Sequence, residues 1–421
     1  MKNLILFCLM PLLSFSSVWE PANSWDDLEI NWEVKFSEWM QSDSVNKNLF
    51  YDETSSYGKI KVDCADVMYL MRAIFSYENS LDFKVMHPLY AHRRVKKYYS
   101  HSMNNWNHLP QNEKVSAFLH YLADNLGTEA LSRNDSYSIN PKNIQPGDFF
   151  MFKAFLDPGS NMATRHSFMV KDITPTGLFD VIYSTQRARD NDKPMYYRKN
   201  HMFSAPLAPT IKGWGFKRFK KPSDYNVANS SLDLFDESQY DIVSNNSGAY
   251  FFKYVQSVLK QSDEKPEEKV ERLFTDLCQR LDDRVEAVND AIIYREKINY
   301  RCMNASEYDI YSTPLRDSRI KAAYVDAQLF LESLDDISLV TNYLNLLQNI
   351  FKSDLSMIDI EELEQACPIQ VKSEEIMDLH TFYKKLLANE ISNNPNDPID
   401  ARWALSQVHL IVKNIKKKGD C

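Results

Sequence analysis

The stretch that decides the fold is PGDFFMFKAF at residues 146–155, continued by HSFMVKDITPTGLFDVIYST at residues 166–185. Both parts are rich in aromatic and β-branched residues, and Thr174-Pro175-Thr176-Gly177 is typical of a hairpin turn. The predicted strands are Asp148–Phe155, His166–Ile173, Leu178–Thr185 and, further on, Gly215–Phe219. We therefore expect an antiparallel sheet.

Helical patterns precede this sheet. Apolar residues recur at spacings of three and four in 24–41, in the segment that begins at Asp63, and in 112–126. Ser24 and Asp27 resemble the start of a capping box. Helices followed by an antiparallel meander predict an α+β domain.

The rest of the chain has a different pattern. Residues 223–247, which are rich in Asn and Ser, are interpreted as a linker. From 248 onward the pattern is helical, which predicts an all-α C-terminal domain over 248–421. The clearest predicted helices are Lys269–Lys297, Pro314–Leu334, Leu339–Phe351 and Ala401–Lys416. The segment 308–317 leaves two interpretations open, a packed corner or a binding surface.

The first residues predict export. Lys2 is followed by the apolar run Leu4–Leu13 and then by small residues, which is typical of a signal peptide over 1–17. The mature protein, with its first domain over 18–222, is then expected to be periplasmic or secreted, without a transmembrane segment. A net charge of −9 argues against a nucleic-acid partner.

In such a compartment, the number of cysteines bears on which of them form disulfides. Six cysteines minus Cys8 of the signal leave five, and four of these lie late in the chain. A single helix between Cys278 and Cys302 would hold them too far apart to pair, so we expect pairings that include Cys367 or Cys421. Cys64 is the expected free thiol.

Cys64 and His166 are the candidate catalytic residues. Cys64 follows Asp63 at a predicted helix start, where unpaired N–H groups favour a thiolate. His166 opens a strand, which is a suitable place for a base. Ser184, Thr185 or Gln186 would lie opposite His166 and orient its ring.

Three motifs resemble those of NlpC-type papain-like cysteine peptidases. They are Asp63-Cys64-Ala65-Asp66-Val67, Pro146-Gly147-Asp148-Phe149-Phe150 and Arg165-His166-Ser167-Phe168-Met169-Val170. Tyr51 lies near the position of a tyrosine that lines the oxyanion side in that family. The resemblance covers about residues 50–186 and implies a papain-like domain that cleaves peptide or amide bonds of peptidoglycan. It departs from the family at Ala65 and Asp66, where Ser and Gly are usual.

The sequence therefore predicts an exported cysteine peptidase or amidase that needs neither a cofactor nor a metal ion. Its expected partners are peptidoglycan or an envelope peptide, together with a protein that docks on the helical region. Two alternatives remain. One is a transglutaminase-like acyl transferase with Asp180 as its third residue. The other is a non-catalytic envelope binding or scaffold protein on a hydrolase-like fold.

Overall fold

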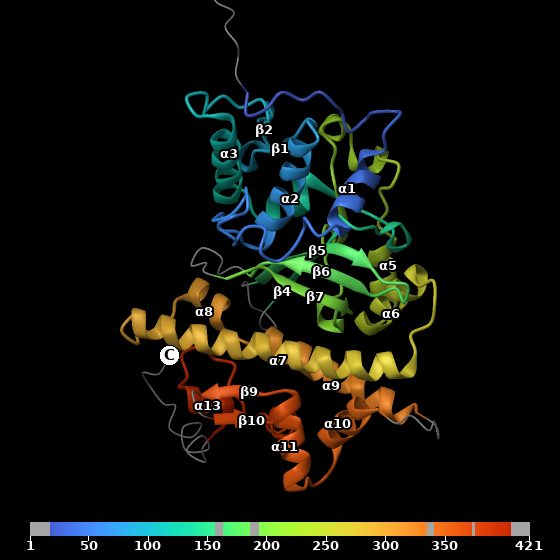
Figure 1. Ribbon diagram of the computed structural model, residues 1–421, viewed down its shortest axis with the longest axis vertical. Coiled ribbons are helices and arrows are strands. Elements are labelled where there is room, and N and C mark those ends of the chain that lie inside the picture. Colours follow the sequence, from blue (N-terminus) through green and yellow to red (C-terminus); the bar gives the residue numbers. More distant parts are fainter. Residues whose placement is uncertain (1–16, 156–162, 186–192, 335–340, 373–374, 406–421) are drawn as a thin grey trace, which may run out of the picture.

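A six-stranded antiparallel sheet lies in the middle of the molecule (Figure 1). Its strands follow the order β3-β8-β4-β5-β6-β7. Their bounds are Ser136–Ser138 for β3, Phe149–Phe155 for β4, Ala163–Ile173 for β5, Phe179–Tyr183 for β6, Tyr196–His201 for β7 and Gly215–Phe219 for β8. The four predicted strands are confirmed, and β3 and β7 are additional.

This computed structural model describes residues 17–155, 163–185, 193–334, 341–372 and 375–405. Apart from Ser17, the expected signal peptide lies outside these ranges. None of the helices in the described ranges combines the length and apolar composition that crossing a membrane requires.

One face of the sheet is covered by N-terminal helices. These are α1 (Trp32–Gln41) and α2 (Cys64–Glu78). Outside them, α3 (Gln111–Asn125) packs on α2, and a small antiparallel pair is formed by β1 (Lys84–Met86) and β2 (Tyr98–Ser100). The helices predicted at Asp63 and over 112–126 are confirmed. The helix predicted over 24–41 begins only at Trp32, capped by Asn31. Trp25 is held outside it because its indole donates a hydrogen bond to the carbonyl of Asp82 (2.9 Å).

The other face carries a second apolar layer. The helices α5 (Ser238–Asn245) and α6 (Gly248–Leu259) pack there, with the rings of Phe150 and Phe252 5.6 Å apart. The segment 223–247 was expected to be a linker, but it contains α5, which belongs to the core. Gln239 in α5 is fully buried and accepts a hydrogen bond from the N–H of Phe216 (2.9 Å). A short polar segment can thus be structural when a side-chain amide completes the backbone hydrogen bonds of a strand.

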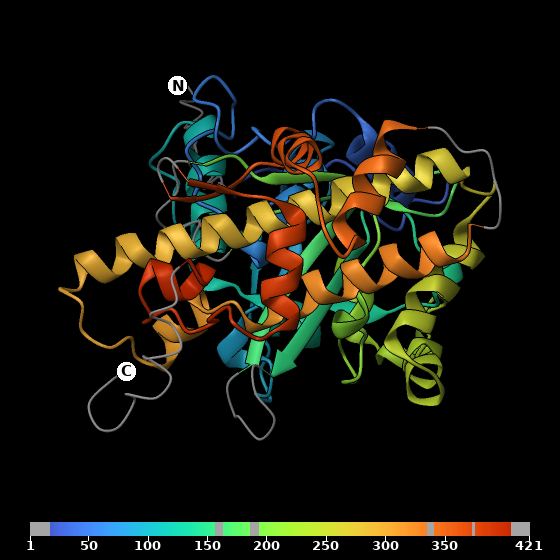
Figure 2. The same cartoon turned by 90° about the horizontal axis from the view of Figure 1, so that it is seen from below.

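The C-terminal region lies beneath this layer (Figures 1 and 2). Its helices are α7 (Pro266–Lys297), α8 (Ala305–Tyr311), α9 (Pro314–Glu332), α10 (Asn342–Phe351), α11 (Met357–Ala366), α12 (Leu379–Leu387) and α13 (Ile399–Trp403). The region is not all-α, because β9 (Ile369–Lys372) and β10 (Glu375–Met377) form an antiparallel pair. The helix predicted over 401–416 ends at Trp403, followed by Ala404 with a left-handed backbone. The residues after Leu405 lie outside the described ranges.

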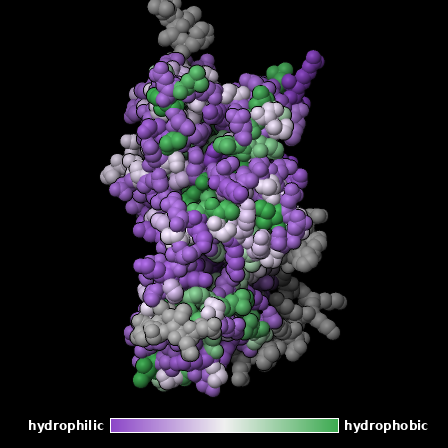
Figure 3. Space-filling view, turned by 90° about the vertical axis from the view of Figure 1, so that its right-hand side faces the viewer, coloured by the Kyte–Doolittle hydropathy of each residue, from purple (hydrophilic) through white to green (hydrophobic). Residues whose placement is uncertain are grey.

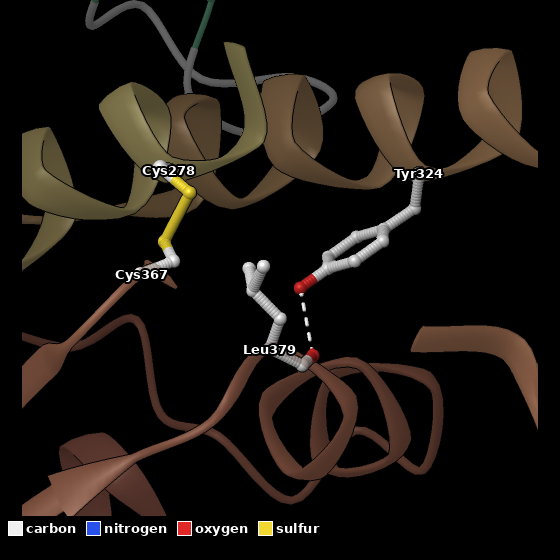
Figure 4. Close-up of a disulfide and its surroundings, with 4 residues drawn as sticks. All are labelled: Cys278, Tyr324, Cys367 and Leu379. Atoms are coloured by element: carbon white, nitrogen blue, oxygen red, sulfur yellow. Dashed lines mark hydrogen bonds between the residues drawn. A yellow bond between two sulfur atoms is a disulfide. The ribbon is translucent and has the colours of Figure 1, made fainter. Parts of the chain in front are cut away.

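A disulfide joins two parts of this region. Cys278 of α7 pairs with Cys367, with Cα atoms 5.7 Å apart (Figure 4). Cys302 is also disulfide-bonded. The prediction of pairing through Cys367 is confirmed, and so is that of Cys64 as the free thiol within the described residues.

Candidate functional site

Cys64 is the first residue of α2. Asp63 caps the helix, and its Oδ1 accepts hydrogen bonds from the N–H groups of Ala65 (2.8 Å) and Asp66 (3.1 Å). Asp66 in turn accepts a hydrogen bond from the N–H of Asp63 (2.7 Å). A capping box therefore fixes where α2 begins and places Cys64 against the sheet.

The thiol of Cys64 is shielded from solvent. Its side chain is fully buried, and its Sγ lies 3.6 Å from Oγ1 of Thr128 in the short helix α4 (Thr128–Ala130). Ser167 on β5 donates a hydrogen bond to the carbonyl of Cys64 (2.8 Å). Burial, reinforced by the charge of Asp63, raises the pKa of the Cys64 thiol to about 12. The pKa of Cys64 is therefore not lowered by the helix end as expected. Loss of water destabilises the thiolate more than the nearby N–H groups stabilise it.

His166 lies on the opposite face of the sheet from Cys64. Side chains alternate along a strand, and Ser167 is the residue of β5 that reaches Cys64. The ring of His166 instead packs edge-on against Phe168 (4.6 Å between centroids) and Tyr183 (5.4 Å). The expected Cys64–His166 pair is not formed, because a difference of one residue along a strand reverses the face.

The residues expected to orient the His166 ring are divided in the same way. Continuing the β5–β6 register by three residues brings Thr185 opposite His166, and both line one cavity. Ser184 points to the other side, where its hydroxyl donates a hydrogen bond to the carbonyl of Val62 (2.7 Å). Gln186 lies outside the described residues. Thr185 could therefore orient the imidazole, but away from the thiol.

The two remaining candidates also lie apart from the thiol. Tyr51 is 46% exposed and lines a surface hollow to which Cys64 does not contribute. Asp180 accepts hydrogen bonds from the hydroxyl of Tyr197 (2.7 Å) and the N–H of Asn200 (2.9 Å). The acyl-transferase triad is thus not assembled. In the described ranges, no group of three or more His, Cys, Asp and Glu side chains is placed to hold a metal ion.

A cavity of about 100 Å³ lies on the His166 side of the sheet, against α7, α8 and α9. We call it the sheet–helix cavity. Its wall includes His166, Phe168 and Tyr183 from the sheet and Asp283, Ser312 and Arg319 from the helical region. Part of the segment 308–317 contributes to this wall. Arg319 was missed because no local pattern links a charged residue of α9 to a strand about 150 residues earlier.

The polar groups of this cavity are unevenly satisfied. Asp283 accepts a hydrogen bond from Arg198, and Glu286 accepts one from Lys193 (2.6 Å). By contrast, Nε of Arg319 and Oγ of Ser312 are buried and have no hydrogen-bond partner among the described residues. The acids are thus engaged, while one guanidinium nitrogen and one hydroxyl have no partner among the described residues.

His166 is neutral in this setting. Burial, followed by the positive charges of Arg319 and Arg316, lowers the pKa of His166 to about 3. A neutral imidazole offers one hydrogen-bond donor and one acceptor. The arrangement suits the binding of a polar group better than the uptake of a proton from a thiol.

A second, larger hollow of about 550 Å³ lies between α6, α7 and α9. Several of its charged residues pair with each other, as in Arg272–Glu264 (2.6 Å) and Arg280–Asp276 (2.6 Å). Figure 3, which views the right-hand side of Figure 1, shows a surface that is mostly hydrophilic with scattered hydrophobic residues.

No family model, curated protein or solved structure matches this chain. The resemblance to NlpC-type peptidases therefore rests on the short motifs alone.

Burial of Cys64 makes a direct prediction for its reactivity. At pH 8 a thiol with a pKa of about 12 is ionised in only about one molecule in ten thousand. Native protein treated with iodoacetamide should therefore keep Cys64 unmodified, as measured by mass spectrometry of its peptides. The same unreduced protein in concentrated urea should be labelled there rapidly. Rapid labelling of the native protein would contradict the buried thiol.

Proposed function

We propose that this chain is an exported, non-catalytic binding protein of the cell envelope, built on a hydrolase-like α+β domain. The observation that carries the proposal is the placement of Cys64 and His166 on opposite faces of one sheet. A cysteine nucleophile acts as a unit with a base within hydrogen-bond reach. The backbone of β5 stands between these two side chains.

A peptidase that used this pair would need a different register. Shifting β5 by one residue would turn His166 toward Cys64, but it would also turn all the remaining side chains of the strand to the opposite face. Phe168 and Val170, both buried in the apolar layer, would lose their partners. That penalty favours the binding role over hydrolysis.

The expected compartment is part of the proposal. A disulfide between Cys278 and Cys367 supports an oxidising location, because such bonds are rare where glutathione keeps thiols reduced. This disulfide supports the proposal that the mature protein is periplasmic or secreted.

Purified peptidoglycan sacculi test this role. Wild-type protein and the variant C64A should sediment with sacculi to the same extent, within about twofold, because the buried thiol takes no part in binding. Neither protein should release soluble fragments detectable by chromatography and mass spectrometry. A peptidoglycan endopeptidase serves as the positive control for release.

Two results would overturn the proposal. If wild type releases fragments and C64A does not, Cys64 is a nucleophile and the chain is a hydrolase. If neither protein sediments with sacculi, peptidoglycan is not its ligand.

A further inference from the structure

The sheet–helix cavity contains a hydroxyl without a partner. Ser312 is 3% exposed and lines the cavity, and its Oγ makes no hydrogen bond within the described part of the chain. Buried polar groups in folded proteins are almost always paired, so an unpaired one calls for a ligand or water. A group that enters the cavity can supply the missing bond.

The charge at the cavity is also unbalanced. The Nε of Arg319 is buried, and although Asp283 attracts its charge, Arg280 and Arg198 repel it. Asp283 is itself engaged by a hydrogen bond from Arg198. A buried cation without its own counter-ion is costly for a folded protein. An incoming anion would remove that cost.

The start of α9 adds to the positive character. This 19-residue helix begins at Pro314 without a side-chain cap, and its first residues line the cavity. The positive end of a helix dipole favours an anion. Arg316 in the first turn adds a second guanidinium, which is steadied by its hydrogen bond to the carbonyl of Ser312 (3.1 Å).

The opposite wall is apolar. Phe152, Phe168 and Tyr183 present aromatic surface from β4, β5 and β6. We propose that the sheet–helix cavity binds a small carboxylate that carries an apolar substituent. The carboxylate lies against Arg319 and Ser312, and the substituent lies against Phe168 and Tyr183. A guanidinium fork matches a carboxylate in bidentate geometry.

This inference names a ligand class for the binding role proposed above and rests on that role. The probes are N-acetylalanine and its uncharged amide, titrated into the full-length mature protein by calorimetry. Wild type should bind the acid at least about tenfold more tightly than the amide, because only the acid compensates Arg319.

Three variants locate the site. S312A should weaken binding of the acid by about threefold to tenfold without lowering stability, because the hydroxyl has no partner to lose. R319M should abolish measurable binding and raise the unfolding midpoint of the ligand-free protein by about 2 °C, since it removes an uncompensated buried charge. K321Q, on the exposed side of the same helix, is the matched control and should bind like wild type.

The inference is overturned if wild type binds neither probe, or binds acid and amide equally. It is also overturned if S312A binds the acid as wild type does, a result that remains decisive should R319M fail to fold. These outcomes are distinguishable from failure of the envelope role, because sedimentation with sacculi is measured separately and without the probes.

Discussion

Replacing Cys278 and Cys367 together by alanine is expected to lower the free energy of unfolding by about 4.6 kcal/mol, the chain-entropy value for a loop of this length. The disulfide links positions 89 residues apart and so restricts most of the C-terminal region in the unfolded chain. Urea denaturation, with hydrogen exchange measured in α7 and α11, would show the loss.

A neighbouring hydrogen bond provides the control. Tyr324 donates one to the carbonyl of Leu379 (3.0 Å) in the same layer, as Figure 4 shows. Y324F removes this bond and should cost only about 1 kcal/mol. A double cysteine variant that loses no more than Y324F would show that the disulfide does not stabilise this region.

The variant D148N should lose about 3–5 kcal/mol of stability, because it leaves the guanidinium of Arg218 buried without its counter-ion. Asp148 accepts two hydrogen bonds of 2.7 Å from Arg218, and both side chains are almost fully buried. It also accepts one from the N–H of Gln145 (2.8 Å). Asp148, which directly precedes β4, therefore links the start of this strand to β8.

The matched control is D26N, in which the lost partner is exposed. Asp26 pairs with Lys221 at 3.4 Å on the surface, where such a pair contributes less than about 1 kcal/mol. Thermal or urea unfolding of both variants would separate the two cases. Equal losses of stability in D148N and D26N would mean that burial of the Asp148–Arg218 pair does not increase its contribution to stability.

The sequence predicted those elements whose signals are local. The cap at Asp63 and the turn at Thr174-Pro175-Thr176-Gly177 depend on nearby hydrogen bonds, and both are present. The turn closes with the N–H of Gly177 on the carbonyl of Thr174 (2.9 Å). Local chemistry is enough for such features.

The face on which His166 lies could not be predicted. When a sheet is covered on one side, apolar residues mark the inward face. Here both sides are covered, and Met169 packs in one apolar cluster while Phe168 packs in the other. Alternation then shows that successive side chains of β5 point to opposite faces, but not whether the odd-numbered or the even-numbered residues face α2. The Cys64–His166 pair required the even-numbered residues to face α2. It is therefore not formed, although its strand was correctly predicted.

The helix α7 belongs to two units at once. Its 32 residues span about 48 Å at the usual rise per residue. One side closes the sheet–helix cavity through Asp283, and the other is fastened to the C-terminal region through Cys278. A break before α7 would leave α5 and α6 on the sheet but would remove the helix that closes the sheet–helix cavity, whereas a break after it would leave the helix without half of its packing. The molecule therefore has no clean point of division, although its sequence changes character midway.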